Sequence, residues 1–223
     1  VAPSRGLGDV YKRQVFGRKY PNVGYGTMFK RWIDSYCERG YNSYGNGSAM
    51  RVSFIGEHFD TLKKVEDEAQ KSALCTHNHP EGVKGAQVIA GCGYLAKNGA
   101  SKKEIKSYVQ KKFGYSLNKR LSFYRVFSRF DMSCQKSVPL ALQCFLESDS
   151  WEECIRNVFS VRCDTDTIGA IAGGIADAYF HGTGFDEDAL LRQFLIKPNK
   201  FGAMDPFLYQ WAIAKQEESG EPS

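Results

Sequence analysis

Asp164-Thr-Asp-Thr-Ile-Gly-Ala-Ile-Ala-Gly-Gly174 is the stretch of sequence that decides the fold. After its acidic start, Ile168, Ile171 and Ile175 recur at the spacing that places apolar side chains on one face of an α-helix. The glycines in this stretch lower its helix propensity, and close contact with neighbouring helices is the expected compensation. The stretch therefore predicts a helix that packs tightly among other helices.

The acidic start of this helix is a candidate metal site. Asp164 and Asp166 stand one residue apart, close enough for their carboxylates to share a divalent cation, and Thr167 adds a neutral oxygen. The N-terminus of the helix directs its positive dipole end to the same place. Alternatively, the two acids cap the helix. A cap needs only one carboxylate, and a cation would remove the repulsion that the second one adds, so the metal interpretation is favoured.

Helical spacing of apolar residues also dominates the rest of the chain. Local signals place four helix starts and one stop: a cap at Asp60, a first turn at Pro80, capping boxes at Ser101–Glu104 and Ser150–Glu153, and a stop at Gly114. A helix is also expected over 138–146, whereas the aromatic and charged stretch 116–136 is expected to be a long connection. Because no convincing alternating strand pattern is found, the sequence predicts an all-α chain.

The length of the chain suits one domain. Its 223 residues, of which 42% are hydrophobic, suffice for one substantial core. Residues 1–14 have no initiator Met and no clear periodicity, and they resemble a translated sequencing-adapter artefact, so they are set aside. We expect a single helical domain over 15–215 and a polar tail over 216–223.

Charge and cysteine content limit the partners and the compartment. The net charge is only +5, and the basic residues of 102–129 are explained more simply by a solvated helix face than by a nucleic-acid surface. Seven cysteines without a Cys-x-x-Cys pair argue against a disulfide framework and favour reduced thiols in the cytoplasm. No apolar run approaches the roughly 20 residues that cross a bilayer. We therefore expect neither nucleic acid nor a membrane as a partner.

A polar segment, Asn42–Arg51, is a candidate ligand loop. Gly45 and Gly47 flank Asn46, so the backbone can turn sharply and bring its amides close to a ligand, with phosphate favoured if a helix starts beyond them. Gly-Asn-Gly is also an ordinary turn, and the segment taken alone favours that interpretation.

A second polar cluster, Thr76-His-Asn-His-Pro80, contains two histidines. His77 and His79 could bind zinc, but no Cys or His partner stands nearby at a familiar spacing. Alternatively, this cluster ends one helix and caps the next, and the histidines only form hydrogen bonds. As a third option, His77 contacts a polar ligand at the junction of the two helices.

Together and in this order, the three clusters resemble the ADP-ribosylglycohydrolase family, in its small bacterial form related to dinitrogenase reductase-activating glycohydrolase. The likeness runs from about residue 16 to about residue 179. It implies an all-α, orthogonal multi-helix bundle with two Mg²⁺ ions, or sometimes Mn²⁺, in a cleft. The implied substrates are ADP-ribosylated proteins or ADP-ribosyl small molecules.

The resemblance also implies roles for particular residues. Asp164, Asp166 and Thr167 correspond to metal ligands, and His77 corresponds to a residue that contacts ADP-ribose. The loop that holds the diphosphate and lies near the adenosine corresponds to Ser43, Tyr44, Gly45, Asn46, Gly47 and Ser48.

The sequence departs from the family pattern at its start and beside the acidic motif. The family's opening helices carry an acidic residue and a Thr-Asp-Asp-Thr motif, and neither is found here. Because these residues supply the rest of the metal shell and the catalytic acid or base, no catalytic residue is identified, and we expect the first helices to be missing. Arg162 and Cys163 stand where glycines are usual, and Phe54 stands where proline is usual.

The resulting hypothesis is a metal-dependent hydrolase that removes ADP-ribose from a protein side chain or a related conjugate, with this chain an impaired, N-terminally truncated fragment. The alternative is a non-catalytic ADP-ribose-binding helical module that keeps the loop at Gly45–Ser48 and His77. A purely structural helical protein is a third possibility.

Overall fold

The computed structural model describes residues 5–21, 24–186 and 189. Within these residues the chain is all-α and has no strand beyond an isolated bridge between Gly45 and Ser133, which confirms the predicted fold class. The helices follow one another as α1 (Arg5–Lys19), α2 (Thr27–Ser35), η1 (Asn46–Ser48), α3 (Ser53–His58), α4 (Leu62–Leu74), α5 (Pro80–Lys97), α6 (Lys102–Phe113), α7 (Leu121–Phe127), α8 (Cys134–Leu146), α9 (Trp151–Phe159) and α10 (Thr165–Phe180). The predicted polar tail over 216–223 lies outside the described residues.

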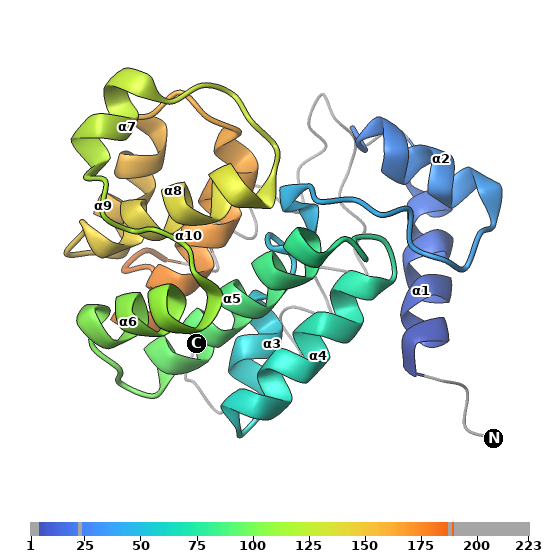
Figure 1. Cartoon of the computed structure of the whole chain (residues 1–223), viewed down its shortest axis with the longest axis horizontal. Helices are drawn as coiled ribbons and strands as arrows, with labels where there is room; N and C mark the ends of the chain where they lie inside the picture. The colour runs from blue at the N-terminus through green and yellow to red at the C-terminus, as the bar shows by residue number, and fades with distance from the viewer. Residues whose placement is uncertain (1–4, 22–23, 187–188, 190–223) are drawn as a thin grey trace.

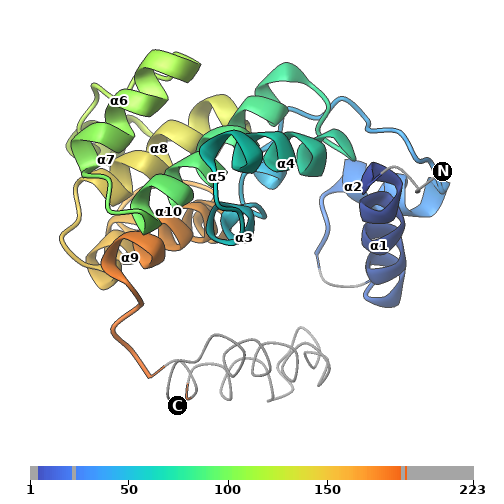
Figure 2. The same ribbon diagram turned by 90° about the horizontal axis from the view of Figure 1, so that it is seen from below.

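Helix α5 lies at the centre of the bundle, in contact with α3, α4, α6, α8 and α10 (Figures 1 and 2). Its glycines allow the close contacts that this position requires. Helix α3 crosses α5 so closely that a Cβ on Gly56 would lie 2.6 Å from the carbonyl oxygen of Ala90. Side chains could not pass between backbones at this separation, so the crossing depends on the small residue.

Helix α10 is the helix predicted from the opening stretch. Ile168, Ile171 and Ile175 are all buried in the main core. A Cβ on Gly174 would collide with the Ser53 side chain of α3. The glycines of this helix are therefore compensated by close packing at Gly174, whereas a Cβ on Gly169 would meet nothing within 4 Å.

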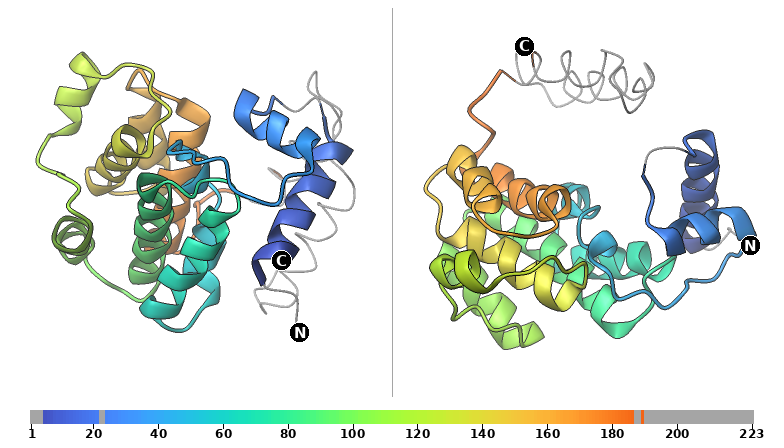
Figure 3. Two further views of the ribbon diagram at one scale, coloured as in Figure 1. Left: turned by 45° about the vertical axis from the view of Figure 1, so that its right-hand side comes forward. Right: turned by 90° about the horizontal axis from the view of Figure 1, so that it is seen from above.

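Helices α1 and α2 stand together beside α4 (Figures 2 and 3). They share a small second core of Val10, Trp32, Ile33 and Cys75. Residues 5–14, which the sequence analysis set aside, form part of α1, and Gln14 is buried with its amide donating to the Cys37 carbonyl at 2.8 Å. The foreign origin of 1–14 stays a prediction.

Several predicted helix ends are confirmed. Ser101 and Glu104 form a complete capping box at the start of α6. Gly114 ends the same helix with a φ of 71°, in the left-handed region that favours glycine. Pro80 occupies the first turn of α5, where its missing N–H costs nothing.

Two predicted caps are corrected. Thr61 caps α4 in place of Asp60, because its extended backbone lets its hydroxyl accept the N–H of Lys64. At α9 only half of the capping box forms: Ser150 accepts the N–H of Glu153, but the Glu153 carboxylate accepts the N–H of Asp149, at 2.6 Å.

The stretch 116–136 is not a plain connection. It contains α7, whose first N–H, on Leu121, donates to the Glu147 carboxylate at 2.8 Å. Because this cap comes from the far end of α8, no local pattern predicts it. Helix α8 also begins at Cys134, before the predicted start at Val138.

All seven cysteines are free thiols, as expected. Among the described residues, no helix combines the length and the apolar character needed to cross a membrane.

Candidate functional site

The Gly-Asn-Gly segment is fixed to the entrance of α8. The N–H of Asn46 donates to the Met132 carbonyl at 2.7 Å, and the N–H of Cys134 donates to the Tyr44 carbonyl at 2.9 Å. Directly after Gly45, the chain turns into the short helix η1. These contacts to a distant segment distinguish the loop from an ordinary exposed turn.

The side chains of the loop divide between exposed and buried positions. The Ser43 hydroxyl accepts the N–H of Gly45 at 3.1 Å, which leaves its own hydrogen available to a ligand oxygen. The Tyr44 ring is 54% exposed and lies edge-on to the His79 ring. Ser48, predicted among the ligand-binding residues, is fully buried and donates to the Gly82 carbonyl at 2.7 Å, so its side chain supports the loop from inside.

His77 packs against the two glycines of this loop. A Cβ on Gly47 would lie 3.1 Å from Nε2 of His77, and a Cβ on Gly45 would lie 3.6 Å from it. A Cβ at Gly47 would crowd the ring, whereas one at Gly45 would make an ordinary van der Waals contact with it. The loop and the Thr-His step, which are separate in sequence, are therefore one structural unit.

Hydrogen bonding sets the tautomer of His77. Arg51 donates to the Thr76 hydroxyl at 2.7 Å, and this hydroxyl lies 2.8 Å from Nδ1 of His77. Thr76 is fully buried, so its hydroxyl hydrogen needs the acceptor that Nδ1 provides, and we assign the ring proton to Nε2. Burial, with Arg51 and Arg13 nearby, lowers the pKa of His77 to about 3. The imidazole is thus a neutral N–H donor on the loop side.

The neighbouring histidine has a different role. Nδ1 of His79 accepts the N–H of Glu81 at 3.1 Å and caps α5, as the helix-cap alternative predicted. Within the described part of the chain, no three or more His, Cys, Asp or Glu side chains gather to hold a metal ion. The structure therefore does not support a zinc site at this cluster.

Asn46 joins the loop to the acidic motif. Its side-chain amide donates to the Asp164 carboxylate at 2.8 Å and to the Ser137 hydroxyl at 2.9 Å. Asn46 is 6% exposed, so both bonds are sheltered from water. Three polar clusters that are far apart in sequence therefore meet at one place.

The acidic motif does not act as a side-chain cap. Asp164 occupies the N-cap position of α10 without a side-chain cap hydrogen bond, and Asp166 accepts the N–H of Thr167 at 2.9 Å. Burial raises the pKa of Asp164 and the neighbouring Asp166 raises it further, while the amide of Asn46 opposes them. The carboxylates are thus held close together at an electrostatic cost that a cation would offset.

The donor set fits one side of a magnesium site. Asp164, Asp166 and Thr167 offer hard oxygen atoms, the ligands that Mg²⁺ prefers. These residues come from one segment, and octahedral Mg²⁺ takes about six ligands, so waters or further groups would have to complete the shell.

Ser137 and Met132 were not predicted as part of the site. Ser137 receives the amide of Asn46, and the Met132 carbonyl receives its N–H. Met132 is 58% exposed and lies opposite Asn46 in the bridge, whereas Tyr44 lies opposite Cys134. Met132 lies within the stretch 116–136 and Ser137 directly follows it, and no residue pattern there marks their pairing with the loop.

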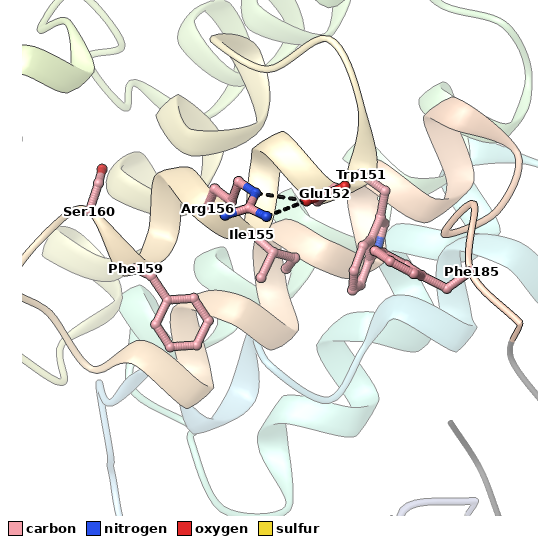
Figure 4. Close-up of a pocket in the computed structure, with 7 residues that line it drawn as sticks. All are labelled: Trp151, Glu152, Ile155, Arg156, Phe159, Ser160 and Phe185. Carbon is pink, nitrogen blue, oxygen red and sulfur yellow. Dashed lines mark hydrogen bonds and ion pairs between the residues drawn. The ribbon is translucent and has the colours of Figure 1, made fainter. Parts of the chain in front are cut away.

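A separate hollow of about 520 Å³ lies on the outer face of α9 (Figure 4). Trp151, Phe159 and Phe185 line it, and an ion pair between Glu152 and Arg156 crosses the helix surface. It contains no residue of the candidate site.

The fold and the site together define an all-helical protein with a glycine loop bound to a carboxylate motif. The model of the ADP-ribosylglycohydrolase family matches residues 6–193, and the chain belongs to this family. A solved structure titled "ADP-ribosylglycohydrolase-related protein complex" superposes with a TM-score of 0.67 at 22% sequence identity, over 94% of this chain and 72% of that one.

Curated relatives include ADP-ribosylhydrolase ARH3 of Mus musculus, which is 28% identical in an alignment of 222 residues. The alignment covers 73% of this chain and 60% of the relative. ADP-ribosylhydrolase ARH3 of Homo sapiens is also 28% identical and is covered over 61% of its length. The chain thus spans about 60% of the length of these relatives.

Proposed function

We propose that this chain contains the ADP-ribose-binding loop and one side of the metal site of an ADP-ribosyl hydrolase. The proposed reaction removes ADP-ribose from a modified protein side chain or from an ADP-ribosyl small molecule. Family membership supports the hydrolase class. The observation that carries the proposal is the bond from Asn46 to Asp164, because it places the ligand loop directly against the carboxylates.

The loop is suited to the diphosphate and the adenosine. Backbone amides of a glycine loop attract phosphate oxygens, and the Ser43 hydroxyl has its hydrogen available to donate to one. The exposed ring of Tyr44 offers a face for the adenine. Because His77 is neutral and carries its proton on Nε2, it would donate one hydrogen bond to the ligand without adding charge.

The acidic motif is suited to the ribose end of the ligand. Cleavage at the anomeric carbon builds positive charge on the sugar, which nearby carboxylates stabilise. Asp164, Asp166 and Thr167 would hold Mg²⁺, or Mn²⁺, whose charge would orient the ribose hydroxyls and activate water. Asn46 keeps the Asp164 carboxylate in place, and the N–H of Thr167 does the same for Asp166. The catalytic acid or base is not assigned.

The test is release of ADP-ribose from ADP-ribosyl-arginine and from an ADP-ribosylated protein, with Mg²⁺ or with EDTA. Turnover that requires Mg²⁺ and disappears in Asp164→Ala supports the hydrolase. Turnover that is unchanged in Asp164→Ala would refute the assignment of the acidic motif.

The second candidate is a binding module that does not catalyse. It is favoured by the contact between the Gly45–Ser48 loop and His77, which forms a candidate ADP-ribose site without a metal ion. Calorimetric titration with ADP-ribose separates the two functions. A module binds equally with Mg²⁺ and with EDTA, whereas binding in the hydrolase strengthens with Mg²⁺. No binding under either condition would contradict both.

A further inference from the structure

A hollow of about 540 Å³ lies between α7, the segments on either side of it, and α8. None of the predicted site residues lines it. Two of its wall residues nevertheless touch the candidate site: Ser137 accepts the amide of Asn46, and Cys163 precedes Asp164 in the chain. The hollow is therefore adjacent to the loop and the acidic motif but separate from them. Its volume falls within the range of about 300–1,000 Å³ that is usual for small-ligand sites.

Exposed aromatic rings line this hollow. Phe123, Phe127 and Phe130 are 38%, 65% and 58% exposed. The rings of Phe123 and Phe127 lie with their centroids 4.8 Å apart. Clustered exposed rings offer faces on which a planar group can stack.

The same wall carries cations. Lys119, Arg129 and Lys136 are exposed, and within the described part of the chain no carboxylate forms an ion pair with any of them. The acidic side chain of this wall, Asp131, accepts the N–H and the hydroxyl of Ser133 at 2.8 and 2.6 Å. Nζ of Lys119 lies 4.3 Å from the centroid of the Phe123 ring. The net charge on the lining residues is therefore positive, with Arg129 and Lys136 available to an anion and Lys119 packed on a ring of the same wall.

We propose that this hollow binds a nucleotide, with its base stacked on the phenylalanine rings and its phosphate held by Arg129 and Lys136. Neither the aromatic rings alone nor the cations alone account for the composition of this wall. An acidic peptide would use the cations and leave the rings unused, and an apolar ligand would use the rings and leave the cations unused. A nucleotide uses both, since every base has a stacking face and every phosphate is an anion. The proposal is independent of the hydrolase assignment because it uses different residues.

The test is a titration of the full chain with 5′-AMP, followed by calorimetry. Phe127→Ala and Arg129→Glu are the test variants, and both change exposed side chains. Phe159→Ala and Arg156→Glu are matched controls, since Phe159 is 73% exposed and Arg156 is a surface cation on α9, away from the hollow. Tyr44→Ala is included because the candidate loop could also accept AMP. Circular dichroism checks that each variant is folded.

The expected result is a loss of AMP affinity of about ten-fold in Phe127→Ala, a size typical of a lost base–aromatic stack, and a similar loss in Arg129→Glu that shrinks at high salt. The controls should bind as the unmodified chain does. In a Tyr44→Ala background, which removes the contribution of the candidate loop, Phe127→Ala should still lower the AMP affinity by about ten-fold. Three results would overturn the proposal: no AMP binding, AMP binding that depends on Tyr44 and not on Phe127, or equal binding of a hexaglutamate peptide that depends on Arg129 alone.

Discussion

The side-chain amide of Asn46 donates a 2.8 Å hydrogen bond to the carboxylate of Asp164, across 118 positions of the sequence. The same amide donates to Ser137 at the start of α8, so one buried residue connects the ligand loop, α8 and α10. In the proposed metal site, Asn46 would orient a ligand of the metal through this hydrogen bond, and such residues affect metal affinity without touching the metal.

Asn46→Ala should weaken magnesium-dependent binding of ADP-ribose by about ten-fold or more, because Asp164 loses the group that orients it. It should also lower the free energy of unfolding by about 1–3 kcal/mol, since the buried Ser137 hydroxyl and the partly buried Asp164 carboxylate lose a donor. Titration calorimetry and urea denaturation measure the two effects.

Asn157→Ala is the matched control. Asn157 is 7% exposed, and its amide donates to the carbonyls of Cys144 and Glu147, away from the site. The control should lose comparable stability and keep its ADP-ribose affinity. Equal affinity losses in both variants would mean that Asn46 acts only through stability.

Acid should destabilise the protein through His77. Its pKa in the folded chain is lowered from 6.5 to about 3, so the unfolded chain takes up a proton in this interval and the folded chain does not. The stabilisation that neutral His77 gives the folded chain is complete above pH 6.5 and is lost as the pH falls toward 3. In this interval the free energy of unfolding should fall by up to about 1.4 kcal/mol per pH unit. The free energy of unfolding, measured by urea at several pH values, should show a shallower slope in His77→Gln. Identical slopes would exclude His77 as the titrating group.

Two glycine substitutions should have opposite effects on stability. Gly56→Ala places a Cβ 2.6 Å from the Ala90 carbonyl, and because backbone must shift, it should cost about 1–3 kcal/mol. Gly169→Ala meets nothing within 4 Å inside α10 and should stabilise by about 0.5–1 kcal/mol. Thermal unfolding followed by circular dichroism gives the sign of each change. A stabilising Gly56→Ala would show that α3 and α5 are not packed this closely.

The corrected cap of α4 can be tested directly. Thr61→Ala should cost about 1 kcal/mol because the N–H of Lys64 loses its acceptor. Asp60→Ala should cost less, since Asp60 contributes its backbone carbonyl, which accepts the Tyr94 hydroxyl at 3.0 Å and survives the substitution. Urea midpoints of the two variants rank the caps, and the reverse order would restore Asp60 as the cap.

Structural features could be predicted from the sequence where the interacting residues are close together in the chain. Ser101 pairs with Glu104 at the start of α6, and Gly114 donates its N–H to the nearby Gln110 carbonyl at its end, so the limits of α6 were visible in the sequence. Helix α7 was missed because its first N–H is capped by Glu147, which lies 26 residues away. The sequence signal for a helix start around Leu121 is weak, and the start of α7 is set by its tertiary contact with Glu147.

The candidate site divides in the same way. The acidic pair and the Gly-Asn-Gly loop were visible because their chemistry lies within short segments. The bonds from Asn46 to Ser137 and to Asp164 were not visible, since they depend on how α8 and α10 meet the loop. Ser48 shows the converse: its place in the loop suggested ligand contact, but its side chain is turned to Gly82 and buried.

The central position of α5 has a consequence for how this protein assembles. Its pairing with α4 joins neighbours in sequence, whereas its pairing with α10 joins segments from opposite parts of the chain. Contacts between near neighbours close short loops and form early, and distant ones form late. The loop and the acidic motif on α10 therefore meet only when α10 docks, so the proposed binding of ADP-ribose, followed during refolding, would report the docking of α10.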